Sequence, residues 1–145
     1  MPSKRPKVVL VNRCIVFDKE KQKILIIKRS KNDHYAPEKW EFPGGKLDQG
    51  QDLSNALERE VLEETGLFVM PTSRMAYIES QIIAKGPYQG LPYIVIIGKG
   101  KRVGGKLKLS KEHDDHKWIN PDNLPDLNYK DHVKKSLACI KPFQT

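Results

Sequence analysis

The interpretation of this sequence starts from the segment GKLDQGQDLSNALEREVLEETGL, residues 45–67. Its middle is rich in leucine, alanine and glutamate, which favour helix, and Gly66 stands where a helix would stop. The pattern therefore predicts a helix that begins at Asp52 or Gln51 and ends at Thr65.

Three glutamates of this predicted helix gather on one side. At about 100° per residue, Glu60 and Glu64 fall within or beside the arc of the apolar stripe, and Glu63 lies about 60° beyond Glu60. That stripe consists of Leu53, Leu57 and Val61. Carboxylates beside a buried face are costly unless a cation neutralises them, and this many oxygen ligands suit Mg²⁺ or Mn²⁺. A merely acidic helix is the alternative. In that case Arg59 pairs with Glu63 one turn later, which leaves two carboxylates uncompensated.

The turn Pro43-Gly44-Gly45 precedes this helix. Glycine has no Cβ and tolerates unusual backbone angles, so the chain can approach the helix closely here. A backbone carbonyl in this turn can complete the oxygen shell of a metal ion.

These residues resemble the Nudix box, G-x5-E-x7-R-E-U-x-E-E-x-G-U, in which U is aliphatic. Gly45 fits its first position and residues 59–67 fit its second half in register, while Gln51 replaces its first glutamate. Residues 40–46, WEFPGGK, resemble the lead-in of the MutT-like branch. The resemblance implies a Nudix α/β/α sandwich and a Mg²⁺-dependent hydrolase, with Mn²⁺ as the substitute ion. The uncharged Gln51 is expected to weaken metal affinity without abolishing activity.

The rest of the chain fits such an α/β fold, with a mixed β-sheet between helices in one domain over residues 1–145. Residues 8–17 and 23–28 are expected to form a hairpin, and the segment 129–140 a second helix. Further strands are expected at 67–70, 75–84, 92–98 and 116–120, with a hairpin turn at residues 104–105.

The resemblance also suggests roles for individual residues in the metal site. Glu60 and Glu64 are expected as principal ligands, Glu63 as a third ligand or a bridge, and Gly44 as the carbonyl ligand. Arg59 is the arginine of the box.

The general base is expected to be a box glutamate or a carboxylate late in the chain. Residues 112–118 resemble the acidic segment that precedes a tryptophan-containing strand in this family. Glu112 and Asp115 are therefore the late candidates.

Substrate contacts are expected from residues outside the box. Arg29 and Lys46 are placed to bind phosphates. Asn128 resembles a base-reading asparagine of MutT-like enzymes, and the alternative is that it caps the final helix. Tyrosines that could stack on a base are Tyr35, Tyr77 and Tyr129.

The leading hypothesis is therefore hydrolysis of a nucleoside triphosphate, an oxidised purine among the candidates, to a monophosphate and pyrophosphate. Dinucleoside polyphosphates, ADP-ribose, nucleotide sugars and RNA caps are rival substrates. A nucleotide- or RNA-binding module without turnover is the rival from another class.

The formal net charge of +8 is uneven, because six basic residues lie between Lys99 and Lys111. They indicate either a solvated edge hairpin or a surface that attracts polyanions, and the lack of interleaved aromatics speaks against RNA. No apolar run approaches the roughly 20 residues that would span a membrane. We expect a cytoplasmic monomer or homodimer whose partner is a small nucleotide.

Overall fold

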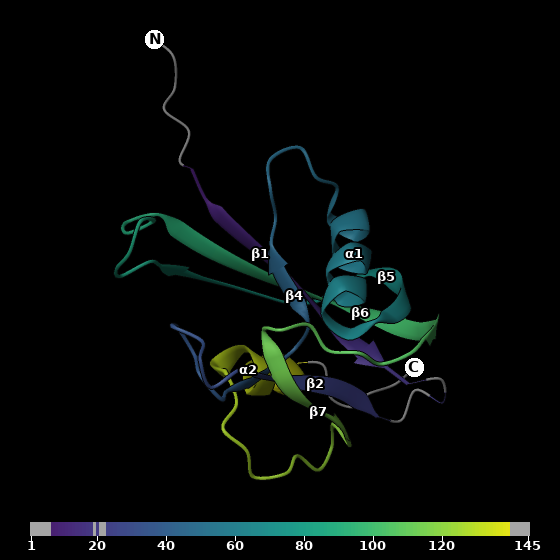
Figure 1. Cartoon of the computed structure of the whole chain (residues 1–145). Coiled ribbons are helices and arrows are strands. Elements are labelled where there is room, and N and C mark those ends of the chain that lie inside the picture. Colours follow the sequence, from purple (N-terminus) through teal and green to yellow (C-terminus); the bar gives the residue numbers. More distant parts are fainter. Residues whose placement is uncertain (1–6, 19, 21–22, 140–145) are drawn as a thin grey trace.

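The computed structural model describes residues 7–18, 20 and 23–139, without the side chains of residues 72–75. Seven strands and two helices follow one another along the described chain (Figure 1). The strands are β1 (Val9–Phe17), β2 (Ile24–Arg29), β3 (Trp40–Glu41), β4 (Gly44–Lys46), β5 (Leu67–Ile82), β6 (Pro92–Gly105) and β7 (His113–Ile119). The helices are α1 (Leu53–Thr65) and α2 (Asp131–Cys139).

The strands form one mixed sheet. Its main path runs β3-β2-β1-β6-β5, with β4 paired to β1 and β7 paired to β2. The β1–β6 pair is parallel, and the other pairs are antiparallel. The predicted mixed sheet and the β1–β2 hairpin are confirmed.

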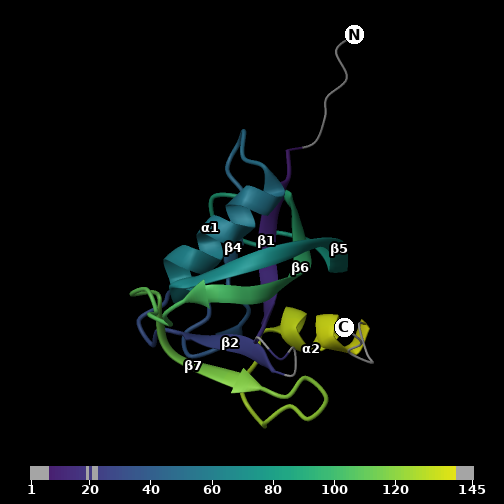
Figure 2. The ribbon, with the colours of Figure 1, turned by 90° about the vertical axis from the view of Figure 1, so that its right-hand side faces the viewer.

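The two faces of the sheet carry separate cores, because successive side chains of a strand point to opposite faces. In β1, Val11 and Ile15 join the core that includes Val133 and Leu137 of α2. The alternate residues of the same strand, Cys14 and Val16, join the core that includes Leu57 and Val61 of α1. Figure 2 shows the two helices on opposite sides of the strands. The predicted α/β/α sandwich is therefore confirmed.

Helix α1 has the predicted ends. The Asp52 side chain accepts a hydrogen bond from the Asn55 N–H, and Gly66 ends the helix in the left-handed conformation. The predicted apolar stripe is wrong at its first member, because Leu53 is 39% exposed. The first turn is held instead by a polar contact, in which the Asn12 side-chain amide donates to the Leu53 carbonyl over 2.9 Å.

Three predictions about strands need correction. The turn at residues 43–45 continues as the short strand β4, because Gly44 and Gly45 pair with β1. The two strands predicted at 67–70 and 75–84 form the single strand β5. This strand continues past Pro71, and its register against β6 shifts between Pro71 and Met75. The glycines at 104 and 105 make no hairpin turn, since they pair with Phe68 and Leu67 at the end of β6.

The last strand and helix lie close to their predicted positions. Strand β7 begins at His113, three residues before the predicted start, and α2 begins at Asp131. Val133 and Leu137 are buried as predicted, and Ile140 lies outside the described residues. Among the described residues, no helix has the length and apolar character needed to span a membrane.

Candidate active site

A cleft of about 570 Å³ opens between α1, β1, β4 and the connection from β5 to β6. The charged residues that line it include both carboxylates and cations. The carboxylates are those of Glu60, Glu64 and Glu112, and the cations are those of Arg13, Arg29, Lys46, Lys85 and Lys130. A cleft of this size is in the range that encloses a small ligand.

Glu64 is the buried carboxylate of the cleft. It is 6% exposed, and its Oε1 accepts a hydrogen bond of 2.7 Å from the Gly44 N–H. Burial raises the pKa of this carboxyl to about 8, although the Gly44 hydrogen bond and the Arg13 charge act in the opposite direction. A cation beside the carboxyl would compensate the buried negative charge of the ionised form. Glu64 therefore fits the role of a metal ligand.

Glu60 lies one helical turn before Glu64 and lines the same cleft. Its carboxylate packs against Gly45, where an added Cβ would lie 2.9 Å from Oε2. Only glycine leaves room for this approach. Burial and the nearby Glu63 charge raise the pKa of the Glu60 carboxyl.

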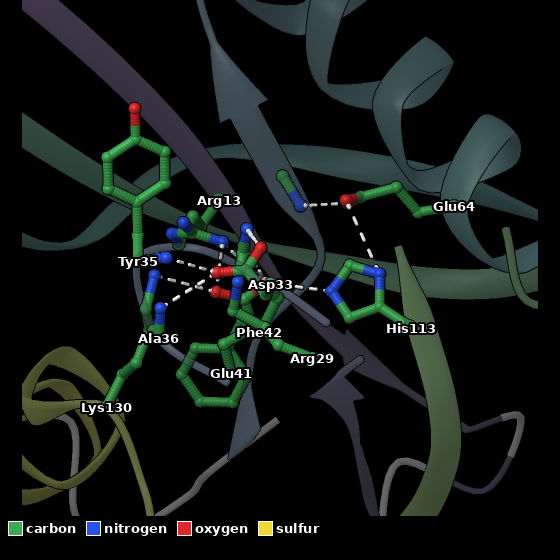
Figure 3. A network of polar contacts seen from close by, with 11 residues as sticks. Arg13, Arg29, Asp33, Tyr35, Ala36, Glu41, Phe42, Glu64, His113 and Lys130 are labelled. Atoms are coloured by element: carbon green, nitrogen blue, oxygen red, sulfur yellow. Dashed lines mark hydrogen bonds and ion pairs between the residues drawn. The ribbon is translucent and has the colours of Figure 1, made fainter. Parts of the chain in front are cut away.

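A further carboxylate and an imidazole meet Glu64 from the start of β7. Glu64, Glu112 and His113 offer ligand atoms that all lie within 4.8 Å of one another. Figure 3 shows the His113 ring between Glu64 and Glu41. This group of oxygen and nitrogen atoms fits a divalent cation.

Several cations of the cleft, called the cationic wall, are held by Glu41, whose side chain is 1% exposed. Its Oε1 lies 3.3 Å from Arg13 Nη1 and 3.0 Å from Lys130 Nζ. Its Oε2 lies 2.9 Å from Arg29 Nη1 and 2.8 Å from His113 Nε2 (Figure 3). One carboxylate thus holds three cations at the cleft, and Arg29 is paired with Asp33 as well.

The neighbouring cations favour the ionised form of the Glu41 carboxyl. Burial by itself would raise the pKa of this carboxyl, but Arg13, His113, Lys130 and Arg29 together hold it well below its usual range. Burial and the neighbouring Arg13 charge lower the pKa of Lys130. The wall therefore gathers cations that repel one another, which favours binding of an anion.

Several predicted site residues lie elsewhere. Glu63 is not among the residues that line the cleft; its carboxylate lies 3.5 Å from Arg59 Nε and its side chain is 60% exposed. Asp115 lies outside the cleft lining, and its Oδ1 accepts from the His116 N–H. The predicted ion pair of Arg59 with Glu63 is present, but Arg59 Nη2 also lies 3.6 Å from Glu60 Oε1, so the prediction that Glu60 stays uncompensated is wrong.

Some of the predicted substrate-binding residues line the cleft and others lie outside it. Arg29 and Lys46 line the cleft, and Lys46 Nζ lies 4.9 Å from the centre of the Tyr88 ring. Asn128 is exposed outside the cleft, and it lies three residues before α2 begins at Asp131. Of the three tyrosines considered for stacking, Tyr35 lines the cleft. None of the six basic residues between 99 and 111, all of them described, lines it.

The NUDIX domain model matches residues 9–138. The chain belongs to the NUDIX family. It is 34% identical over 111 residues to the 8-oxo-dGTP diphosphatase of Buchnera aphidicola, covering 76% of this chain and 77% of that protein. It is 27% identical over 126 residues to the 8-oxo-dGDP phosphatase NUDT18 of Danio rerio, covering 83% of this chain. The chain spans about a third of that relative's length, 35%.

A solved structure shows the same NUDIX fold. The MutT protein of Methanosarcina mazei Go1 superposes with a TM-score of 0.75 and covers 94% of each chain at 22% sequence identity. The family resemblance read from residues 45–67 is confirmed, as is its MutT-like character.

Gln51, which departs from the NUDIX box, lies outside the cleft. Its Oε1 accepts a hydrogen bond of 2.7 Å from the Asp48 N–H and closes the turn before α1. We expect Gln51→Glu to keep this turn, because a carboxylate accepts the same hydrogen bond. Mg²⁺ binding should tighten by at most about threefold, since solvent and salt screen the added charge. Isothermal titration calorimetry measures this, and weaker Mg²⁺ binding would contradict the prediction.

His132 links the stability of this NUDIX fold to pH. Its ring packs against Phe42 at 5.8 Å, and burial followed by the Arg13 and Lys130 charges lowers its pKa to about 2. Below about pH 6.5, the ordinary pKa of histidine, His132 binds a proton in the unfolded chain but not in the folded chain. This histidine therefore destabilises the fold as the pH falls. Glu64 acts oppositely, because its raised pKa favours the folded state at low pH.

The test therefore compares His132→Leu with the wild-type protein in the absence of metal. From pH 6.5 to 4.5 we expect the free energy of unfolding of the variant to gain about 2–3 kcal/mol relative to wild type. Urea unfolding at several pH values measures the difference. The exposed His34→Gln control should show no such gain, and parallel pH profiles of His132→Leu and wild type would contradict the prediction.

Four residues around Glu41 were not selected from the sequence: Arg13, Glu41, His113 and Lys130. The cleft residues Lys85 and Tyr88 were not selected either. Arg13 offered a signal, because it is the one charged residue of the largely apolar strand β1. Glu41 lies within the MutT-like lead-in but has no distinguishing spacing. His113 lies in the segment 112–118, from which only the carboxylates were selected, and Lys130 stands in no distinguishing pattern.

Proposed function

We propose that this chain is a Mg²⁺-dependent pyrophosphohydrolase that cleaves a nucleoside triphosphate to a monophosphate and pyrophosphate. The observation that carries the proposal is the division of charge across the cleft. The carboxylates of Glu60 and Glu64, called the carboxylate wall, line the cleft together with Arg13, Arg29 and Lys130, the cations that Glu41 holds. A polyphosphate with its divalent cations needs both walls at once.

The carboxylate wall would hold the metal. Glu60 and Glu64 are the proposed principal ligands, with the Gly44 carbonyl beside them. Glu63 would contribute only from the rim of the cleft, since its carboxylate lies beside Arg59. Bound Mg²⁺ supplies charge for the phosphate oxygens and lowers the pKa of a water molecule. Glu112, exposed and lining the cleft, is the proposed acceptor of that water's proton.

The cationic wall would hold the phosphates. Arg13 and Arg29 both present guanidinium groups at the cleft, and their Nε atoms have no hydrogen-bond partner within the described part of the chain. Lys46 and Lys130 add two ammonium groups. Guanidinium and ammonium donors of this kind bind phosphate oxygens and orient the bond that breaks.

The base would lie against tyrosine rings. Tyr35, which is 87% exposed, and Tyr88, which is 46% exposed, both line the cleft. An aromatic ring stacks on any base, so the pair favours a nucleotide without fixing its identity. The relatives named for 8-oxo-dGTP and 8-oxo-dGDP make oxidised purine nucleotides the first substrates to test.

A panel of nucleotides, each with and without Mg²⁺, tests the proposal. It contains oxidised and ordinary purine nucleoside triphosphates and diphosphates, together with dinucleoside polyphosphates, ADP-ribose, nucleotide sugars and capped RNA. We expect Mg²⁺-dependent release of pyrophosphate and a monophosphate from a triphosphate. If one of the other substrates is cleaved instead, into two fragments that each carry phosphate, that substrate class would replace the triphosphate in the assignment. Binding without Mg²⁺-dependent hydrolysis would overturn the enzymatic proposal in favour of a binding module.

A further inference from the structure

The imidazole of His113 has a ring nitrogen that the proposed function leaves unused. The side chain is fully buried, at 0% exposure, at the first residue of β7. Its Nε2 lies 2.8 Å from Glu41 Oε2. Its Nδ1 is buried and has no hydrogen-bond partner among the residues that the structure describes. A buried nitrogen without a partner is costly, so a ligand for it is expected.

The contact with Glu41 determines which nitrogen carries the hydrogen. Glu41 lies within 3.3 Å of the cations of Arg13, Arg29 and Lys130, and a carboxylate paired in this way only accepts hydrogen bonds. The Nε2 of His113 must therefore donate to it. In the neutral imidazole this leaves a lone pair on Nδ1, the arrangement in which histidine binds metals.

The distance from Nδ1 to Glu64 suits a cation between them. Nδ1 lies 4.0 Å from Glu64 Oε2, which is too long for a hydrogen bond. It is close to twice the 2.0–2.1 Å of a typical metal–ligand bond, as expected for two ligands on opposite sides of one ion. Glu64 Oε1 is already occupied by the Gly44 N–H, so Oε2 is the oxygen left for the ion.

We propose that Nδ1 of His113 is a nitrogen ligand of the divalent cation at Glu64, and that the site therefore prefers Co²⁺ or Mn²⁺ to Mg²⁺. The inference rests on the metal site of the proposed function. Imidazole suits first-row transition metals, whereas Mg²⁺ prefers oxygen ligands throughout. Glu41 completes the carboxylate–histidine–metal arrangement by fixing the ring from its other side.

Pulsed EPR on the wild-type protein loaded with Mn²⁺ tests the ligand directly. We expect modulation of the electron spin echo by an imidazole nitrogen. The matched control His116→Gln, three residues along the same strand, should keep this modulation. A wild-type spectrum without nitrogen coupling overturns the proposal.

Two substitutions separate the ligand atom from the Glu41 contact. His113→Gln places an amide near the position of Nε2, so it can still donate to Glu41 while removing Nδ1. His113→Asn places an amide oxygen near the position of Nδ1 but loses the contact with Glu41. Both should lose the nitrogen modulation and at least about tenfold in Co²⁺ affinity. His113→Asn should keep Mg²⁺ affinity within about threefold, because oxygen replaces nitrogen. A ratio of Co²⁺ to Mg²⁺ affinity unchanged in both variants overturns the proposal.

These measurements distinguish the inference from the proposed function. If Mg²⁺-dependent hydrolysis is observed without nitrogen coupling, the proposed enzymatic function stands and His113 is not a ligand of the metal site. Nitrogen coupling in a protein that hydrolyses no nucleotide would retain the histidine ligand and remove the enzymatic proposal.

Discussion

Replacing Glu64 by glutamine is expected to lower Mg²⁺-dependent turnover by about three orders of magnitude or more while the protein remains folded. Glutamine has the same shape, and its amide oxygen can still accept the hydrogen bond from the Gly44 N–H. It carries no charge for a metal ion, however. Steady-state rates with the best nucleotide of the substrate panel measure the loss, and thermal unfolding checks the fold.

Helix α1 provides a matched control for this experiment. Glu58 is exposed, lies on the same helix and does not line the cleft. Glu58→Gln removes the same charge from the same helix and should keep turnover within about twofold of wild type. Turnover of Glu64→Gln within tenfold of wild type would remove Glu64 from the metal site. Equal losses in both variants would indicate a general effect of charge on the helix.

Replacing Glu41 by glutamine is expected to destabilise the protein by about 3–5 kcal/mol, because three buried or half-buried cations lose their common partner. Arg13, Arg29 and Lys130 each lie within 3.3 Å of this carboxylate. The amide can accept some of the hydrogen bonds but leaves the cations to repel one another. Urea unfolding of the metal-free protein measures the change in the free energy of unfolding.

A surface ion pair supplies the comparison for Glu41. Asp114, which is 43% exposed, lies 3.5 Å from Lys28 Nζ. Because solvent screens such pairs, Asp114→Asn should cost no more than about 1 kcal/mol. A loss of that size for Glu41→Gln would show that the cations of the cleft do not depend on Glu41. Added pyrophosphate should recover part of the lost stability, since an anion binds the cations that Glu41 no longer holds.

Local geometry explains what was predicted correctly. The ends of α1 follow from Asp52 and Gly66, whose side chain and backbone act within one helical turn. The placement of Glu64 beside Leu57 and Val61 follows from helical periodicity alone, and all three are buried. The prediction failed at Leu53, because the end of a helix can extend beyond the sheet that covers its middle.

The cationic wall has no such local signature. His113 meets Glu41 across 72 residues of sequence, and Arg13 reaches the Phe42 carbonyl across 29. These contacts exist because β7 pairs with β2 and β4 pairs with β1, and the sheet register sets which side chains face the cleft. Glu112, the residue before β7, lines the cleft, whereas Asp115 within β7 does not, and the register of β7 against β2 shifts between His113 and Asp115.

Helical and strand periods were enough to predict the helix with its carboxylates and most of the strands, and the spaced motif of residues 45–67 was enough to predict the family. The folded structure was needed to show which titratable groups lie together: Glu64 with His113, and Glu41 with its three cations. The difference lies in the sequence separation of the residues that meet. Backbone geometry fixes neighbours within a turn of helix, whereas strand pairing and packing bring together residues that no local pattern connects.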